Sequence, residues 1–179
     1  MNRIAQLRRS QEGFTLIELL VVVAIIALLA TFAVPKLFDA INKSKKAPGQ
    51  ADMQTISGGL ERFYLESDNG VYPTGTAAQV EAALKAGFLK SSTTFLNGFK
   101  QPYLYGTTTA GAGYVLIDLQ GSGPSATAGG TVTVNCGAGP TAYTFTVPAS
   151  ATGLVVNASI ASADISTCVA PTGAAIIKN

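Results

Sequence analysis

The sequence predicts an α+β fold, in which one long N-terminal helix packs on an antiparallel β-sheet domain. The first third of the chain holds an uncharged apolar run, residues 19–35, followed by apolar side chains at helical spacing. From about residue 102 the pattern changes to short β-like runs separated by Gly, Pro and Ser clusters. A chain of 179 residues can bury one globular core and carry one additional element.

The apolar run is long enough to cross a membrane. As a helix, residues 19–35 measure about 25 Å, and counting from Phe14 brings the helix near the ~30 Å of a bilayer core. The basic residues Arg3, Arg8 and Arg9 precede it, which favours a cytoplasmic N-terminus and an exported C-terminal domain. No A-x-A-like cleavage pattern follows the run, so we expect it to be retained.

Four lysines follow the run on the side that this orientation places outside the cytoplasm: Lys36, Lys43, Lys45 and Lys46. Their position opposes the usual enrichment of Lys and Arg in cytoplasmic segments. We expect the N-terminal arginines to dominate the orientation.

The second half of the helix is expected to be amphipathic. After an interruption at Pro48-Gly49, apolar residues recur at helical spacing as far as about Glu66: Met53, Ile56, Leu60 and Phe63 or Tyr64. This stripe should pack on the globular domain.

A short second helix and a set of strands are expected downstream. Thr76 and Gln79 form a possible capping box, Gly87 ends the helix, and Val80, Ala83 and Leu84 would face the core. Four runs have β-like composition: residues 114–119, 131–136, 142–147 and 154–160.

Composition argues against an enzyme. The chain has no histidine, which removes the commonest general base and transition-metal ligand. We therefore expect no catalysis and no cofactor.

The segment Gly13-Phe14-Thr15-Leu16-Ile17-Glu18-Leu19-Leu20, behind a basic leader and ahead of the apolar run, resembles the class III signal of type IV pilins and type II secretion pseudopilins. The resemblance implies cleavage after Gly13 by a prepilin peptidase and N-methylation of Phe14. It divides the chain into a leader (1–13), a transmembrane and assembly helix (14–38) and a globular α+β pilin domain (39–179).

The resemblance also implies that Glu18 pairs with the terminal amine of a neighbouring subunit, and that Pro35 is the family's proline in the N-terminal helix. A carboxylate at a bilayer centre costs roughly 2.5–3.5 kcal/mol, but Glu18 would lie about one turn from the end of the cleaved helix, where the cost is smaller. Cleavage creates an ammonium at Phe14 that could pair with it. Because an unpaired Glu18 would be penalised in a dry filament core, we expect it to set subunit register.

Three functions stay open, with a type IV pilus subunit favoured. It would polymerise with itself from the inner membrane into a surface filament, using a prepilin peptidase, an assembly platform and a motor ATPase. The alternatives are a major pseudopilin of type II secretion, which would form a periplasmic structure, and a single-pass membrane-anchored binding module.

The two cysteines, Cys136 and Cys168, lie in the C-terminal quarter. In an oxidising compartment they would form one disulfide, and the resemblance implies a staple of the last loop to the sheet. A redox or metal role is the alternative. The chain has neither the histidine nor the CxxC spacing that such a site usually contains.

Two ligand classes are not expected. The segments 69–74 and 98–105 resemble major pseudopilins, relatives that bind calcium, but Asp118 and Asp164 are the only carboxylates in the C-terminal half, so no metal is expected. Specific DNA binding is not expected either, because the chain without residues 1–13 has nine basic and nine acidic residues. About 55 residues follow Gly123, which favours a pilin over a compact pseudopilin.

Overall fold

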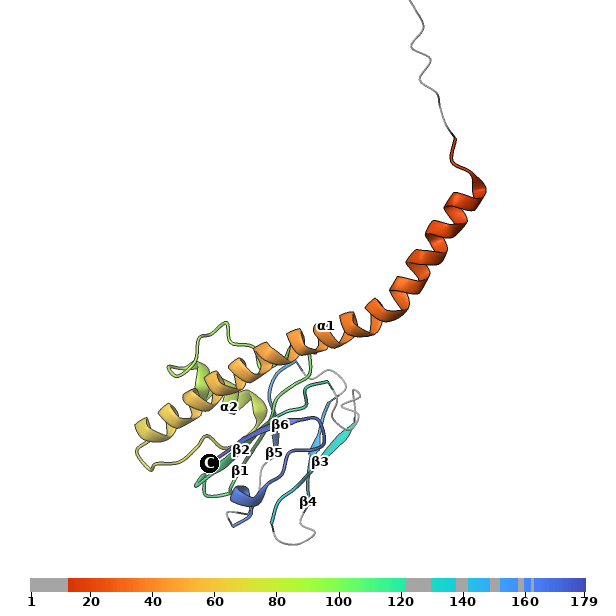
Figure 1. The fold of residues 1–179 in the computed structure, drawn as a ribbon. Helices are drawn as coiled ribbons and strands as arrows, with labels where there is room; N and C mark the ends of the chain where they lie inside the picture. The colour runs from red at the N-terminus through yellow and green to blue at the C-terminus, as the bar shows by residue number, and fades with distance from the viewer. Residues whose placement is uncertain (1–12, 122–129, 138–141, 149–151, 158–159, 162) are drawn as a thin grey trace, which may run out of the picture. The chain divides into compact units, whose positions relative to one another are not determined.

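The computed structural model describes residues 13–121, 130–137, 142–148, 152–157, 160–161 and 163–179 (Figure 1). Residues 1–12 of the expected leader lie outside this description. The chain divides into two compact units, residues 1–41 and 42–179.

Helix α1 spans Leu16–Glu66 without a break. The interruption expected at Pro48-Gly49 is therefore wrong. A proline inside a helix removes one backbone hydrogen bond, but here tertiary contacts hold the helix. Gly49 is buried against Asp118, and the Tyr103 hydroxyl donates to the Gly49 carbonyl at 3.3 Å.

The four-stranded sheet has the order β5-β1-β2-β6. Its strands are β1 (Leu104–Thr107), β2 (Tyr114–Asp118), β5 (Val155–Asn157) and β6 (Ala175–Lys178). Strands β1 and β6 both pair antiparallel with β2, but β5 pairs parallel with β1, with Leu104 opposite Val155. The sheet is thus mixed, and the expectation of a purely antiparallel sheet is wrong at this one pair.

Strands β3 (Thr131–Asn135) and β4 (Ala142–Thr146) form a separate antiparallel hairpin. Val132, Val134 and Phe145 point inward, while the threonines between them are exposed. The four β-like runs of the sequence are confirmed as strands over part of their length, and residues 158–159 of the last run lie outside the described residues. Strands β1 and β6 were not predicted.

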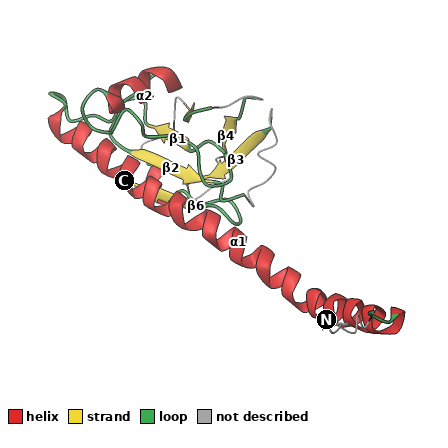
Figure 2. Cartoon of the chain, turned by 90° about the horizontal axis from the view of Figure 1, so that it is seen from above, coloured by secondary structure: helices red, strands yellow, loops and turns green. Residues whose placement is uncertain are grey.

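The four-stranded sheet has a hydrophobic core on each face. Met53, Ile56 and Leu60 of α1 join tyrosines and Leu116 of the sheet in one cluster. The β3–β4 hairpin covers the other face, where Val115 and Ile117 belong to a second cluster. Figure 2 shows the second half of α1 running alongside β6. Strand β2 is buried at every residue because both of its faces are covered.

Helix α2 spans Ala77–Lys85 and begins as the sequence predicts. The Gln79 carbonyl oxygen accepts hydrogen bonds from the backbone N–H and the hydroxyl of Thr76, at 2.9 and 3.0 Å. Val80 and Leu84 are fully buried. Both side chains belong to the same buried cluster as the apolar residues of α1.

Candidate assembly site

Thr15 and Glu18 cap the N-terminus of α1. The Glu18 carboxylate accepts from the Thr15 backbone N–H at 2.9 Å and from the Thr15 hydroxyl at 2.7 Å, and the Glu18 N–H donates to that hydroxyl oxygen at 3.3 Å. This is a reciprocal capping box. Sequence reasoning treated Glu18 as an isolated carboxylate and missed it, although the T-x-x-E spacing is visible in the motif.

The capping box gives Glu18 partners within its own chain. Its carboxylate also lies in the first turn of the helix, where the helix dipole favours a negative charge. Glu18 is therefore stabilised before any contact with another subunit. A terminal amine created at Phe14 would lie next to Thr15, so the amine, the cap and the carboxylate would occupy one turn of chain.

An exposed apolar surface begins beside Glu18. Phe14 is 90% exposed, and a shallow hollow next to the carboxylate is lined by Phe14, Ile17, Val21 and Val22. Helix α1 contains a stretch with a mean hydropathy of 2.8 that is long and apolar enough to cross a membrane, and none of that stretch is buried within the chain. Such a surface marks a membrane or protein contact.

Gly13 and Pro35 flank this surface. Gly13 is exposed, and a side chain added there would meet no atom within 4 Å. Pro35 lies inside α1, within helical backbone on both sides. The first unit thus places Gly13, Phe14, Glu18 and Pro35 along a single exposed helix and the residues that lead into it.

Comparison with known proteins identifies this arrangement. Residues 8–34 match the family described as the prokaryotic N-terminal methylation motif. The chain is 38% identical over 78 residues to the type II secretion system core protein G of Pseudomonas aeruginosa, covering 44% of this chain and 53% of that protein. The N-terminal part of the chain is thus similar to the type IV pilin and pseudopilin superfamily.

Two further relatives represent both branches of this superfamily. The type II secretion system core protein G of Vibrio cholerae is 41% identical over 66 residues, covering 37% of this chain and 44% of that protein. The fimbrial protein EcpC of Eikenella corrodens is 38% identical over 81 residues, covering 45% and 52%. The chain matches about half the length of these relatives. No solved structure matches it.

The described residues have the expected α+β fold, with a long N-terminal helix and β-sheets. The N-terminal signal and the apolar helix are consistent with a precursor in the inner membrane that assembles into a pilus or pseudopilus. Its remaining predicted residues lie in the globular unit.

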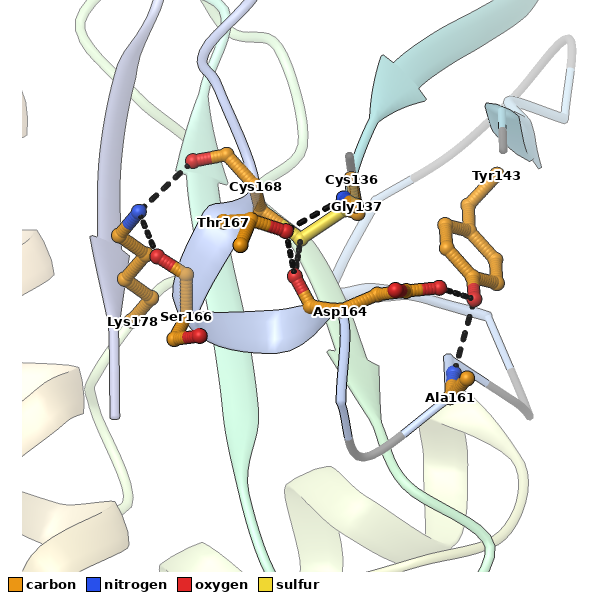
Figure 3. Close-up of a disulfide and its surroundings, with 9 residues drawn as sticks. All are labelled: Cys136, Gly137, Tyr143, Ala161, Asp164, Ser166, Thr167, Cys168 and Lys178. Carbon is orange, nitrogen blue, oxygen red and sulfur yellow. Dashed lines mark hydrogen bonds between the residues drawn. A yellow bond between two sulfur atoms is a disulfide. The ribbon is translucent and has the colours of Figure 1, made fainter. Parts of the chain in front are cut away.

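A disulfide joins Cys136, directly after β3, to Cys168, directly after the 3₁₀ helix η1 (Ile165–Thr167) (Figure 3). The Val169 N–H donates to the Asn135 carbonyl at 2.9 Å beside it, and the Lys178 ammonium of β6 donates to the Cys168 carbonyl at 3.0 Å. The bond therefore ties the hairpin to the segment that returns to the sheet.

The two carboxylates considered for calcium have separate roles. The buried Asp118 accepts from the Asn97 amide at 2.6 Å and from the Gln120 N–H at 3.0 Å, whereas Asp164 accepts from the Tyr143 hydroxyl at 2.8 Å. Among the described residues, no three His, Cys, Asp or Glu side chains gather as metal ligands.

Asp118 instead belongs to a polar contact between α1 and the sheet. Burial raises the pKa of the neighbouring Asp52, and the charge of Asp118 adds to this effect, while a hydrogen bond with Tyr103 opposes it. Burial likewise raises the pKa of Tyr103, with the charges of Asp118 and Asp52 adding to it. The polar contact formed by Asp52, Tyr103 and Asp118 positions α1 on the sheet, and it was not predicted from the sequence.

Proposed function

We propose that this protein is the major pseudopilin of a type II secretion system. The sequence alone favoured a pilus subunit. We prefer the pseudopilin because the chain is similar to core protein G from several bacteria. In this function the mature chains would polymerise through α1 into a short periplasmic filament that acts in protein export.

The geometry of the first unit supports such an assembly pathway. A prepilin peptidase would cut after the exposed Gly13, and the new amine of Phe14 would be methylated. The capping box would hold Glu18 in a satisfied state while the precursor is in the membrane. In the filament, the carboxylate would receive the terminal amine of a neighbouring chain, since each oxygen of a carboxylate can accept more than one hydrogen bond.

The exposed apolar side chains of α1 would supply the driving force for subunit packing. An assembly platform and a motor ATPase would supply the work of extracting each subunit from the lipid. The pairing of Glu18 would fix the axial register, because a neighbouring amine left without a partner in a dry core costs several kcal/mol.

A type IV pilus subunit is the second candidate. The disulfide-bonded hairpin, which lies between β2 and β6 in the sequence, favours it, as does the similarity to a fimbrial protein. In a filament outside the cell, the disulfide would stabilise the hairpin against unfolding.

Gene deletion separates the two candidates. For a pseudopilin, deletion should abolish export of type II substrates into the medium, measured by mass spectrometry of the culture supernatant, and leave sheared surface filaments unchanged. Unchanged export together with loss of sheared filaments, seen by electron microscopy, would assign the protein to a pilus. Mass spectrometry of the mature N-terminus tests cleavage after Gly13 in both cases, and an intact precursor would favour a simple membrane anchor.

A further inference from the structure

The part of α1 that lies in the second unit, residues 42–66, carries opposite charges at its two ends. Lys43 and Lys46 stand at its start, whereas Glu66 and, two residues beyond the helix, Asp68 stand at its end. About 35 Å of helix separates the two ends, which is far more than the ~8 Å screening length of physiological salt. The charges at one end therefore cannot neutralise those at the other within one chain.

The lysines at the start of this segment have no carboxylate partner. Lys45 lies between them in the sequence, and its ammonium is 5.6 Å from the centre of the Phe99 ring in its own domain. Lys43 is exposed and Lys46 is half-buried, and their spacing of three residues makes them neighbours on the helix surface. Among the described residues, neither Lys43 nor Lys46 forms an ion pair.

The acidic end is compensated only in part by its own chain. The last turn of α1 contains no basic residue, although the negative end of the helix dipole favours a cation there. Arg62 pairs with Glu66 at 3.6 Å, but both side chains are more than half exposed, and such exposed pairs contribute little. Within the described part of the chain, Asp68 forms no ion pair. This end therefore attracts cations from outside the chain.

Both ends also present apolar groups. Leu65, next to the carboxylates, is 78% exposed although it lies within α1. Next to the lysines, Ala47 and Pro48 are exposed. Each end thus combines an apolar contact surface with charge of one sign, and protein interfaces combine an apolar centre with polar groups around it. The two surfaces are complementary in charge.

We propose that these two ends meet between neighbouring copies of the chain, with Lys43 and Lys46 of one subunit against Glu66 and Asp68 of the next. This inference rests on the self-assembly in the proposed function, and it applies equally to a pilus. The contact joins two different surfaces of the same chain. Repetition of such a contact produces an open filament when the rotation between copies does not close a ring.

This contact would give the globular unit its own control of subunit register. A correctly placed neighbour brings opposite charges together, whereas a shifted neighbour leaves the lysines unmatched or opposite other lysines, which is unfavourable. The control would act separately from Glu18, which lies in the first unit. Because the attraction is electrostatic and exposed to solvent, it would weaken as the salt concentration rises.

Cross-linking tests which surfaces of the chain meet. The full-length chain with Ala47→Cys/Ser67→Cys has one thiol near each end and keeps all four charges, and its native cysteines do not react because they form a disulfide. Roughly 30 Å of helix separates the two new thiols, so a short bis-maleimide links them only between chains. Cells that assemble the protein should give a ladder of dimers, trimers and larger products. Each single-cysteine variant should give no product beyond the dimer.

Charge reversal identifies the residues responsible. In the cross-linking background, Lys43→Glu/Lys46→Glu should lower the yield of the ladder about tenfold, because carboxylates then face carboxylates. Combining this change with Glu66→Lys/Asp68→Lys should restore the ladder, because the charges are again complementary. An undiminished ladder in the first variant, or no recovery in the combined variant, would overturn the proposal.

Two controls separate this contact from other effects. Lys90→Glu/Lys100→Glu makes the same change of net charge at exposed lysines elsewhere in the domain and should leave the ladder unchanged. A ladder that stops at the dimer would show a closed pair and overturn the head-to-tail contact. Sheared filaments without any ladder would also overturn it and leave self-assembly intact. If wild-type charges give neither filaments nor a ladder, the self-assembly in the proposed function is itself contradicted.

Discussion

At the scale of single residues, Glu18 caps α1 in the structure and has a second, proposed role in assembly. Its carboxylate caps α1 through Thr15, and in the proposed filament it also pairs with a neighbouring amine. Capping needs an acceptor oxygen, which glutamine also has, but pairing with an ammonium needs the negative charge. The two roles can therefore be tested with one substitution.

We expect Glu18→Gln to retain the helix cap and processing but to lower filament yield about tenfold or more, since each 1.4 kcal/mol changes an equilibrium tenfold. The yield of polymer in sheared or cross-linked fractions measures assembly. Mass spectrometry of the N-terminus provides the control, because a correctly cleaved variant shows that insertion was normal. Wild-type polymer yield in this variant would show that the charge of Glu18 is dispensable.

Asp52 provides a pH-dependent test at the same scale. Its pKa is raised in the folded chain, mainly by burial, so the folded state binds a proton more tightly than the unfolded state does. Stability should therefore fall as the pH rises from below the ordinary carboxyl pKa of 3.8 through the raised pKa. Asp52→Asn should remove this fall and be more stable than wild type at neutral pH, with little difference below the unfolded pKa. Thermal unfolding across this pH range measures it, and parallel curves for the two proteins would contradict the assignment.

At the scale of elements, the close approach of α1 to the sheet depends on glycine. A Cβ added at Gly49 would lie 2.5 Å from the Asp118 carboxylate, which is itself held by Asn97. Gly58, in the same helix, has no atom within 4 Å of such a Cβ. The two positions form a matched pair, since alanine is a better helix former than glycine at both.

Gly49→Ala should destabilise the domain by about 1–3 kcal/mol, as overpacking of a core does. Gly58→Ala should stabilise it by about 0.5–1 kcal/mol. Urea unfolding of the two variants beside wild type measures both effects. If Gly49→Ala were as stable as Gly58→Ala, the contact between α1 and Asp118 would not constrain the helix.

At the scale of the whole molecule, the disulfide connects the hairpin layer to the rest of the fold. It closes a segment with a sequence separation of 32 residues. Closure of a loop of this length stabilises a fold by about 3–4 kcal/mol in the chain-entropy model. The hairpin packs on the sheet through Val132, Val134 and Phe145, and these contacts remain when the bond is removed.

We expect Cys136→Ser/Cys168→Ser to lose about 3 kcal/mol of unfolding free energy while keeping the fold, with the loss seen in urea unfolding and the fold in circular dichroism. Wild-type protein under reducing conditions should behave in the same way. Unchanged stability after both treatments would show that packing alone holds the hairpin layer.

Local patterns in the sequence predicted many of the secondary-structure elements. The apolar run, the stripe at Met53, Ile56 and Leu60, and the capping box of α2 each depend on residues within a few turns of one another. Strands β3 and β4 alternate buried and exposed residues, which is the pattern of a sheet with one covered face. Strands β1 and β6 have four residues each, and β1 contains Gly106, so neither forms a run long enough to predict a strand, although β6 contains two isoleucines.

By itself the sequence determined the apolar helix and the order of most elements, because these depend on neighbouring residues. The processing and assembly roles of Gly13 and Glu18 are predictions from the same local pattern. Only the tertiary structure decided that α1 continues through Pro48 and that β5 pairs parallel with β1. It also decided that Asp118 packs on Gly49. These features join segments far apart in the chain, and their stability comes from burial and hydrogen bonds formed after the chain has folded.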